Sequence, residues 1–567
     1  MSAVERVRAA YARIDEVDRP EVWITLRPET DVRAEAELID DRVAGGERLP
    51  LAGLLVAVKD NVDIAGLPTT AGCPSFAYQP ERSATAVERL VGAGALVLGK
   101  TNLDQFATGL VGTRSPYGAV RNALDPAKVS GGSSAGSAVA VALGIADIGI
   151  GTDTAGSGRV PAAFNGIVGV KPTLGLVPTT GVVPACRSYD AVTVFAGTLT
   201  LAQEALAVMT GPDPADPRSR CWPAGLRLAA APVVAIPCDE NLAPLTHEAR
   251  RAFGDAVARL QERGVRAEAV DVTGLLDAAT LLYDGTFVAE RHAAVGEFVD
   301  THPADLDPSV AAIISAAALL TARDHVADLE RLDHHRAAAV RTLDGRSALL
   351  LPTAPFHPTI AEVAADPIGV NRALGTFTNF VNLLDLAAVA VPAGTADGGP
   401  FGVSVITRAF EDQIGIDLAA MFTGEQATRS YPDTGVDLVV FGAHMRGQLL
   451  NPQLTALGAR FAGDVHTAPE YRMVAIPGHP EKPGIVHTGP ENGASLPGER
   501  WTLAPAALGL FLAALPAPMS LGQVALADGG SAVGFHCDFA TARDCVDITG
   551  HGGWRAYDSS VRAAMAI

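Results

Sequence analysis

Short apolar runs alternate with amphipathic stretches between residues 50 and 200. Runs with the character of buried strands occur at 51–60, 95–101, 147–153 and 166–173, and helical patterns stand between them at 84–95 and 137–146. Strands that are apolar on both sides belong in a sheet that is covered on both faces. The pattern therefore predicts an α/β layered domain.

The pattern changes twice further along the chain. Residues 245–350 are Ala-rich and helical in pattern, and strand-like runs return at 348–355 and 386–394, where they would complete the same sheet. A polar, turn-rich stretch at 428–437 predicts a domain boundary. Beyond it, short strand-like runs separated by Gly and Pro turns predict a smaller, mainly β (α+β) domain over 437–567.

The composition is that of a compact globular enzyme with two or three domains, because the chain has 567 residues and 48% of them are hydrophobic. The N-terminal sequence has the pattern of a polar amphipathic helix, and no apolar run reaches the roughly 18 residues that a membrane span requires. Six scattered cysteines without a CxxC pair predict neither a zinc site nor a disulfide framework. We therefore expect a cytoplasmic protein with no metal and no membrane partner.

The charge balance narrows the possible partners. Lys and Arg total 43 against 63 Asp and Glu, which gives a net charge of −20. So acidic a chain is not expected to bind nucleic acid, because phosphate contacts require a basic face. A small anionic substrate would have to be held by locally placed arginines against this overall field.

The sequence GALVLGKT at 94–101 matches the P-loop pattern of nucleotide-binding proteins. A phosphate loop needs a strand before its first glycine and a flexible loop between its glycines. Here a helical pattern precedes the first glycine, and the residues between the glycines are themselves strand-like. Backbone amides within a sheet cannot wrap a phosphate, so we interpret this match as accidental.

Two Gly/Ser clusters, SGGSSAGSA at 130–138 and TAGSGR at 154–159, flank the apolar sequence VAVALGIADIGI. This flanking excludes a flexible linker, which would lie in polar sequence. No histidine precedes His247, so a serine nucleophile in these clusters would need a different base. Lys59, at the end of the strand-like VAVK, is a candidate. It either extends its amine to the surface or is buried and functional.

In their order and spacing, AVKDN, SGGSSAGSA and GTDTAGSGRVPAAFNGIVGVKPT resemble the amidase signature family over about residues 50–425. The resemblance implies a mixed β-sheet core covered by helices, in a domain over 1–430 that begins with N-terminal helices. It also implies a Ser–cis-Ser–Lys triad. Ser157 would be the nucleophile, Ser133 would be the bridging serine after a cis peptide bond, and Lys59 would be the base.

The loop around the nucleophile would supply further groups. Its backbone N–H groups, just past a strand end, would form the oxyanion hole. These groups belong to Thr154, Ala155, Gly156 and Ser157. Asp153 and Arg159 either pair to hold this loop in shape or form a surface ion pair, and the sequence leaves both interpretations open.

Three segments resemble the allophanate hydrolases within that family: TDTAGSGRVPA with GVVPACRSYD after it, LLYDGTFVAERHAAV at 281–295, and VVFGAHMRGQLLNPQL. The resemblance implies that Tyr283 and Arg291 hold a substrate carboxylate, and eight residues along one helix would place them on nearly the same face. In the alternative interpretation, Tyr283 packs in the core and Arg291 forms a surface pair with Glu290 or a neighbour.

The second domain resembles the γ-glutamyl cyclotransferase-like C-terminal domain of allophanate hydrolases. Cyclotransferases use a glutamate after a helix, whereas the comparable LGLFLAALPAPM has no acid, so cyclotransferase activity is not expected. The resemblance implies decarboxylation of the product, with His444 as the candidate participant and Arg446 and Gln448 as helpers. Alternatively, His444 is structural and the domain mainly stabilises a dimer.

The resemblance as a whole implies an allophanate-hydrolysing enzyme without a cofactor, because the biotin and ATP of urea breakdown belong to urea carboxylase, its functional partner. A homodimer is expected. The alternatives are an amidase for a related small carboxylated amide such as carboxybiuret, and an amidase of broad specificity. The amidase component of a glutamyl-tRNA amidotransferase is disfavoured by the acidic charge and the lack of a basic tail.

Overall fold

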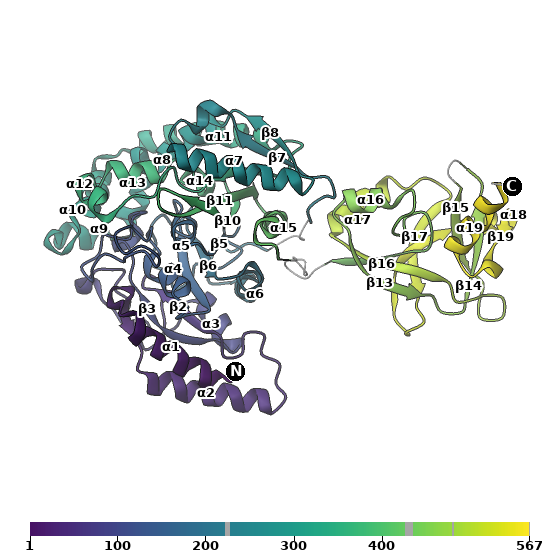
Figure 1. Cartoon of the computed structure of the whole chain (residues 1–567), viewed down its shortest axis with the longest axis horizontal. Helices are drawn as coiled ribbons and strands as arrows, with labels where there is room; N and C mark the ends of the chain where they lie inside the picture. The colour runs from purple at the N-terminus through teal and green to yellow at the C-terminus, as the bar shows by residue number, and fades with distance from the viewer. Residues whose placement is uncertain (222–226, 426–434, 479–480, 566–567) are drawn as a thin grey trace. The chain divides into compact units, whose positions relative to one another are not determined.

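The computed structural model describes residues 1–221, 227–425, 435–478 and 481–565. The chain forms two compact units, of which the first contains residues 1–222 and 233–428 and the second contains 223–232 and 429–567 (Figure 1). The described residues 227–232 therefore belong to the second unit, which the sequence pattern does not predict. Most of the boundary expected at 428–437 lies outside the described residues.

The first unit is built on one mixed sheet of eleven strands, in the order β1-β3-β2-β4-β6-β5-β10-β11-β9-β7-β8. Strand β2 is parallel to β3 and β4, and β7 is parallel to β8 and β9, whereas the other neighbours are antiparallel. The strands are β1 Trp23–Leu26, β2 Leu55–Lys59, β3 Leu96–Thr101, β4 Ile148–Asp153, β5 Val168–Lys171, β6 Ala191–Ala196, β7 Val233–Pro237, β8 Arg266–Val270, β9 Ala348–Pro352, β10 Leu386–Ala396 and β11 Gly399–Arg408.

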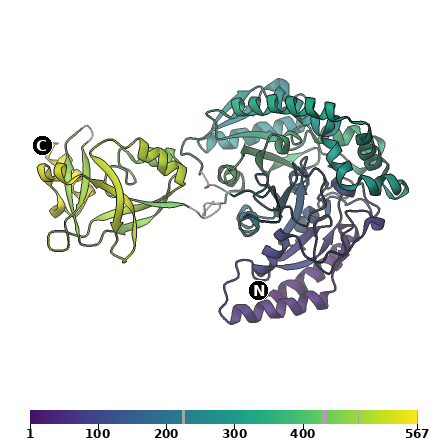
Figure 2. The same ribbon diagram turned by 180° about the vertical axis from the view of Figure 1, so that it is seen from behind.

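Helices cover this sheet, and strands β2, β3, β4, β6 and β9 are buried along their whole length, as the doubly apolar runs predict. The mixed α/β class expected from the sequence is confirmed. The helices are α1 Ala3–Val17, α2 Glu29–Ala44, α3 Thr85–Gly92, α4 Ala135–Ala142, α5 Val160–Asn165, α6 Leu199–Met209, α7 His247–Glu262, α8 Thr273–Asp284, α9 Ala289–Thr301, α10 Pro308–Ala316, α11 Ala322–Leu343, α12 Ile360–Ala365, α13 Gly369–Leu374, α14 Phe380–Leu383 and α15 Asp412–Thr423. Helices α1 and α2 pack side by side next to the N-terminus, drawn in purple (Figure 2).

The segment that matches the P-loop pattern is a strand and not a loop. Residues Leu96–Thr101 form β3, and Lys100 is fully buried with its amine 3.0 Å from the carboxylate of Asp60. The backbone amides between the two glycines are therefore part of the sheet, as the sequence interpretation requires, and Lys100 is already paired.

The second unit has its own hydrophobic core between two small sheets. One sheet has the order β13-β16-β12-β18-β17 and the other the order β15-β14-β19. Its strands are β12 Val436–Val440, β13 Arg460–His466, β14 Tyr471–Ile476, β15 Lys482–His487, β16 Pro497–Leu503, β17 Met519–Ala525, β18 Ser531–Cys537 and β19 Val546–Asp547, and its helices are α16 Asn451–Ala456, α17 Pro505–Ala513, α18 Phe539–Asp544 and α19 Trp554–Met565. The mainly β character expected for this part is confirmed.

Among the described residues, no single helix is long and apolar enough to cross a membrane, and only the bent pair Pro308–Leu319 and Ala322–Leu343 passes that test on length and composition. The same residues contain no group of three His, Cys, Asp or Glu side chains placed to hold a metal ion.

Candidate active site

The candidate triad gathers at one edge of the large sheet because two parallel strands end there. Lys59 is the last residue of β2, and Ser157 follows the end of β4, its parallel neighbour. Parallel strands place their carboxyl ends at the same edge, where α/β proteins bind ligands. Ser133 comes from the turn just before α4, which packs on both strands.

The three side chains form one hydrogen-bonded chain. The Lys59 Nζ lies 2.8 Å from Ser133 Oγ, and Ser133 Oγ lies 3.0 Å from Ser157 Oγ. The Gly132–Ser133 peptide bond is cis. Lys59 is fully buried, so its amine does not extend to the surface and the buried interpretation holds.

The environment of Lys59 favours its neutral form. Burial lowers the pKa of Lys59 to about 7; the charge of Arg291 adds to this shift and the nearby carboxylates oppose it. The amine also donates to Thr152 Oγ1 at 2.7 Å, a partner that the sequence analysis missed. A lysine with a pKa near neutrality can accept a proton at physiological pH, as a general base must.

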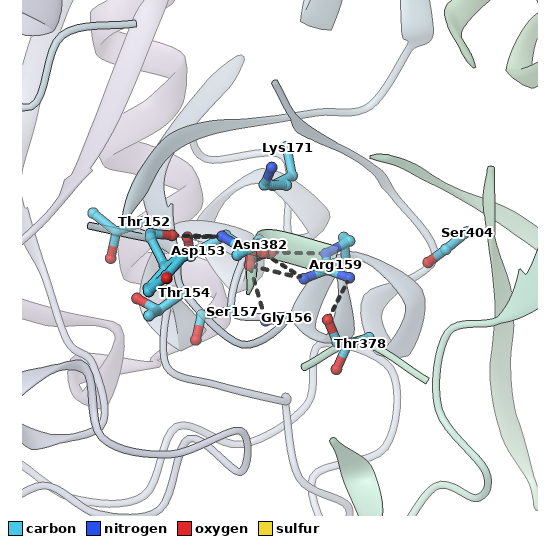
Figure 3. Close-up of polar contacts among 12 residues, drawn as sticks. Thr152, Asp153, Thr154, Gly156, Ser157, Arg159, Lys171, Thr378, Asn382 and Ser404 are labelled. Atoms are coloured by element: carbon cyan, nitrogen blue, oxygen red, sulfur yellow. Dashed lines mark hydrogen bonds and ion pairs between the residues drawn. The ribbon is translucent and has the colours of Figure 1, made fainter. Parts of the chain in front are cut away.

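A buried ion pair holds the nucleophile loop in shape (Figure 3). Arg159 Nε lies 2.9 Å from Asp153 Oδ2, and Arg159 Nη2 lies 2.9 Å from Asp153 Oδ1. Both side chains are fully buried, so the surface-pair interpretation is wrong. Burial alone would raise the pKa of Asp153, but the paired guanidinium and backbone donors lower it overall and keep the carboxylate charged.

Asp153 also hydrogen-bonds to the N–H of Gly156, one of the backbone N–H groups expected to form the oxyanion hole. Its carboxylate accepts the backbone N–H groups of Gly156 and Gly158, each at 2.9 Å. The Gly156 N–H is therefore committed, contrary to its expected role in the oxyanion hole. Within the described chain, the N–H groups of Thr154, Ala155 and Ser157 donate to no acceptor, so these three remain for an oxyanion.

Gly156 serves the loop in another way. It has a φ of 128°, which side-chain-bearing residues rarely adopt, and a Cβ there would lie 2.5 Å from Thr378 Oγ1. Only glycine lets the nucleophile loop approach Thr378 this closely.

Distant residues complete the support of this loop, as Figure 3 shows. Arg159 Nη1 donates to the Thr378 carbonyl at 3.1 Å, and Nη2 donates to Asn382 Oδ1 at 3.2 Å. The amide of Asn382 donates in turn to the carbonyls of Asp153 at 2.7 Å and Tyr189 at 2.8 Å. Thr378 and Asn382 lie more than 200 residues after Arg159, and no local pattern marks them in the sequence.

Tyr283 and Arg291 meet, although not on one helix as expected. Helix α8 ends at Asp284, a turn of 3-10 helix follows at Thr286–Val288, and Arg291 lies in the first turn of α9. The Arg291 Nη2 nevertheless lies 3.4 Å from the Tyr283 hydroxyl, and its guanidinium carbon is 5.3 Å from the centroid of the tyrosine ring.

Arg291 is a buried cation without a carboxylate partner in the described chain. Its side chain is 1% exposed. Nη1 donates to Thr108 Oγ1 at 2.8 Å and to the Ala107 carbonyl at 3.3 Å, whereas Nε has no hydrogen-bond partner. Glu290 instead accepts the backbone N–H of Ser188, so the surface-pair interpretation of Arg291 is wrong. A buried charge of this kind calls for an anion.

His444 lies in the second unit, in a cavity of about 620 Å³. The cavity wall is mostly apolar, and its polar side chains are His444, Gln453 and Lys482. Burial lowers the pKa of His444, and its Nε2 lies 2.9 Å from Gln453 Oε1. The expected helper Gln448 is not part of the wall, and neither is Arg446, whose guanidinium pairs with Glu499.

Comparisons with known proteins agree with this architecture. The model of the Amidase family matches residues 5–414, and the model of the Allophanate hydrolase C-terminal domain matches residues 436–559. The structure of selenomethionine-substituted Kluyveromyces lactis allophanate hydrolase superposes with a TM-score of 0.88 at 38% identity, covering 99% of this chain and 97% of that one. The chain thus has the domain architecture of allophanate hydrolase.

Two groups of curated relatives are similar in sequence. Urea amidolyase of Saccharomyces cerevisiae is 40% identical over 569 residues, covering 94% of this chain but only 31% of the relative. The chain therefore spans about a third of the length of that relative. One subunit of the glutamyl-tRNA(Gln) amidotransferase of Symbiobacterium thermophilum is 35% identical over 448 residues, covering 73% of this chain and 91% of the relative.

Proposed function

The chain belongs to the amidase family, and on that premise we propose that it hydrolyses allophanate, the urea that carries one carboxylate, to ammonia and N-carboxycarbamate. One observation carries the choice of substrate: Arg291 is a buried cation without a carboxylate partner in the described chain, and its charge acts on the pKa of Lys59. An amide without a carboxylate would leave that charge unpaired.

Substrate binding uses Arg291 and Tyr283. The guanidinium and the phenol lie 3.4 Å apart, so one carboxylate can accept hydrogen bonds from both. This pairing supplies the negative charge that Arg291 lacks. It also fixes one end of a small planar molecule, so that its urea carbonyl reaches Ser157 in a defined orientation.

The triad then performs acyl transfer. Neutral Lys59 takes the Ser133 proton, and Ser133 takes the Ser157 proton while Ser157 Oγ forms a bond to the urea carbonyl carbon. The 2.8 Å and 3.0 Å separations of these atoms allow both transfers without movement of the loop. The negative charge that develops on the carbonyl oxygen is met by the N–H groups of Thr154, Ala155 and Ser157.

When the tetrahedral intermediate collapses, the leaving nitrogen takes a proton from the Ser133 hydroxyl and departs as ammonia. Lys59 at the same time gives Ser133 the proton that it accepted earlier. Water then attacks the acyl-enzyme, passes its proton through the same relay, and frees Ser157 and N-carboxycarbamate. Arg159 and Asp153 take no part in these transfers. They position the loop.

For the second unit, the proposal assigns decarboxylation of N-carboxycarbamate to the cavity of His444. The support is its mostly apolar wall, because a weakly polar site destabilises a localised carboxylate relative to neutral carbon dioxide. Lys482 would attract the anion. As the N–C bond breaks and carbon dioxide leaves, the electron pair that remains on the nitrogen would take a proton from water, and the uncharged imidazole of His444 would orient that water. The likeness to urea amidolyases supports urea carboxylase as functional partner. We also propose that this chain forms a homodimer and is located in the cytoplasm.

Ammonia release from freshly prepared allophanate tests this function, with carboxybiuret, biuret, malonamate and simple aliphatic amides as comparison substrates and Ser157→Ala as the control. We expect allophanate to be turned over far faster than the uncharged amides and Ser157→Ala to abolish turnover. Faster turnover of carboxybiuret would assign a related carboxylated amide as the substrate. Faster turnover of simple amides would show a broad amidase and contradict the proposal.

A further inference from the structure

A second cavity of about 240 Å³ borders the candidate active site in the first unit. Tyr283 forms one side of it, so the cavity adjoins the proposed carboxylate site. Several residues between 371 and 379 also line it, among them Gly375 and Asn379. The neighbouring Thr378 packs against Gly156 of the nucleophile loop. The cavity thus shares Tyr283 with the proposed carboxylate site, and Asn379 in its wall directly follows Thr378, which lies against the nucleophile loop.

The carboxamide of Asn379 is free in this wall. The residue is only 6% exposed, and no described residue hydrogen-bonds to its buried Oδ1. Gly375 makes room for the side chain, because a Cβ at that position would lie 2.4 Å from the Asn379 Nδ2. Buried amides are almost always hydrogen-bonded, so one that is not bonded marks a place for a ligand group. Whichever way it is turned, this carboxamide offers an acceptor and a donor.

Arg114 brings a buried positive charge to the same cavity. It is 2% exposed and donates to the carbonyls of Thr108 at 2.9 Å and Pro367 at 2.6 Å. Its Nε has no hydrogen-bond partner, and it forms no ion pair within the described residues. Because Arg291 donates to the hydroxyl of the same Thr108, two buried cations flank this threonine. Arg114 thus places a buried positive charge in the wall of a cavity that also contains the Arg372–Asp284 ion pair.

We propose that Asn379 determines specificity for ureido carboxylates by accepting a hydrogen bond from the bridging N–H of the substrate, an inference that rests on the proposed function. Three groups of allophanate already have partners: the carboxylate at Arg291, the carbonyl oxygen at the oxyanion donors, and the leaving nitrogen at Ser133. The bridging N–H remains. It is bonded directly to the carboxylate carbon, and Asn379 shares a cavity wall with Tyr283, which binds that carboxylate.

The test compares allophanate with malonamate, in which a methylene replaces the bridging N–H, in the full chain with Asn379→Leu. We expect kcat/KM for allophanate to fall about 10- to 100-fold, as when a substrate loses a buried hydrogen-bond partner, and kcat/KM for malonamate to fall less than about 3-fold. Thr280→Val is the matched control. Thr280 lines the same cavity, but its hydroxyl is already bonded to the Asp277 carbonyl, so both substrates should keep their rates.

Thermal unfolding and reaction with a serine-directed phosphonylating probe show whether Asn379→Leu is folded and its triad intact. Equal losses for both substrates, or no loss for either, in a folded variant would overturn the role of Asn379 and leave the proposed function standing. Failure of the wild-type chain to turn over allophanate would overturn both.

Discussion

Two buried arginines of the first unit differ in how their charge is compensated. Arg159 is paired through two hydrogen bonds with Asp153 and is bonded further to Thr378 and Asn382. Arg291, equally buried, donates to a hydroxyl, a carbonyl and a phenol and has no carboxylate at ion-pair distance in the described chain, where Asp190 acts on it only at longer range. A charge that the fold itself neutralises is part of the scaffold, whereas a charge left open belongs to a ligand.

The largest effect is expected when the compensated arginine is removed. Arg159→Leu leaves the Asp153 carboxylate buried and unpaired, so we expect the free energy of unfolding to fall by about 3–5 kcal/mol. Urea denaturation measures this change. Arg82→Leu removes an exposed pair with Glu88 and should change stability by less than about 0.5 kcal/mol. An Arg159→Leu protein as stable as the wild type would show that the pair does not hold the loop.

The uncompensated arginine should behave in the opposite way. Arg291→Met removes a buried charge that has no carboxylate partner, so we expect the free energy of unfolding to stay the same or rise. The kcat/KM for allophanate should fall about 100- to 1000-fold, because the substrate carboxylate then enters without a partner. Denaturation and ammonia release on the same preparation separate the two effects. A loss of stability as large as that of Arg159→Leu would remove the distinction between the arginines.

How much of this site could be predicted from the sequence depends on how local each signal is. Lys59, Ser133 and Ser157 lie in compact motifs, and the apolar runs around them predict the strands that bring them together. Asn382 bonds to the nucleophile loop and Asn379 lines the adjoining cavity. Both lie more than 200 residues after that loop in the sequence, and no periodicity marks them.

Two local predictions failed for identifiable reasons. The single helix predicted through Tyr283 and Arg291 breaks at Asp284–Gly285, a dipeptide typical of turns that would have indicated the break. Contrary to the prediction, the N–H of Gly156 is not available to an oxyanion, because the side chain of Asp153, three residues earlier in the same short loop, accepts its hydrogen bond. The sequence of a loop does not reveal which of its backbone N–H groups will hydrogen-bond to its own side chains.

The pH dependence sharpens the comparison, because Arg291 also acts on the base. With the pKa of Lys59 lowered to about 7, the amine is protonated and inactive below that pH. We expect kcat/KM to fall about tenfold per pH unit below pH 7 and to level off above it. In Arg291→Met the inflection should move to higher pH, because the removed charge lowers the pKa of Lys59.

The rate of inactivation by an uncharged serine-directed probe, followed against pH, measures this shift without the substrate carboxylate. An inflection that stays in place in Arg291→Met would show that Arg291 does not act on Lys59.

The smallest effect on amide hydrolysis is expected from the second unit. His444→Ala alters a cavity in a unit with its own core, so ammonia release should change by less than about 2-fold. Carbon dioxide release should lag further behind ammonia than in the wild type, which parallel assays of both gases detect. An unchanged lag would assign His444 a structural role.

Calorimetric titration with malonate, a dicarboxylate that cannot be hydrolysed, tests most directly whether the unpaired guanidinium of Arg291 binds a substrate carboxylate. The account predicts that malonate binds the wild type and Ser157→Ala with similar affinity, and that Arg291→Met weakens binding at least about 30-fold, the loss of one buried charge-assisted pair. Equal affinity of Arg291→Met and the wild type would contradict the account.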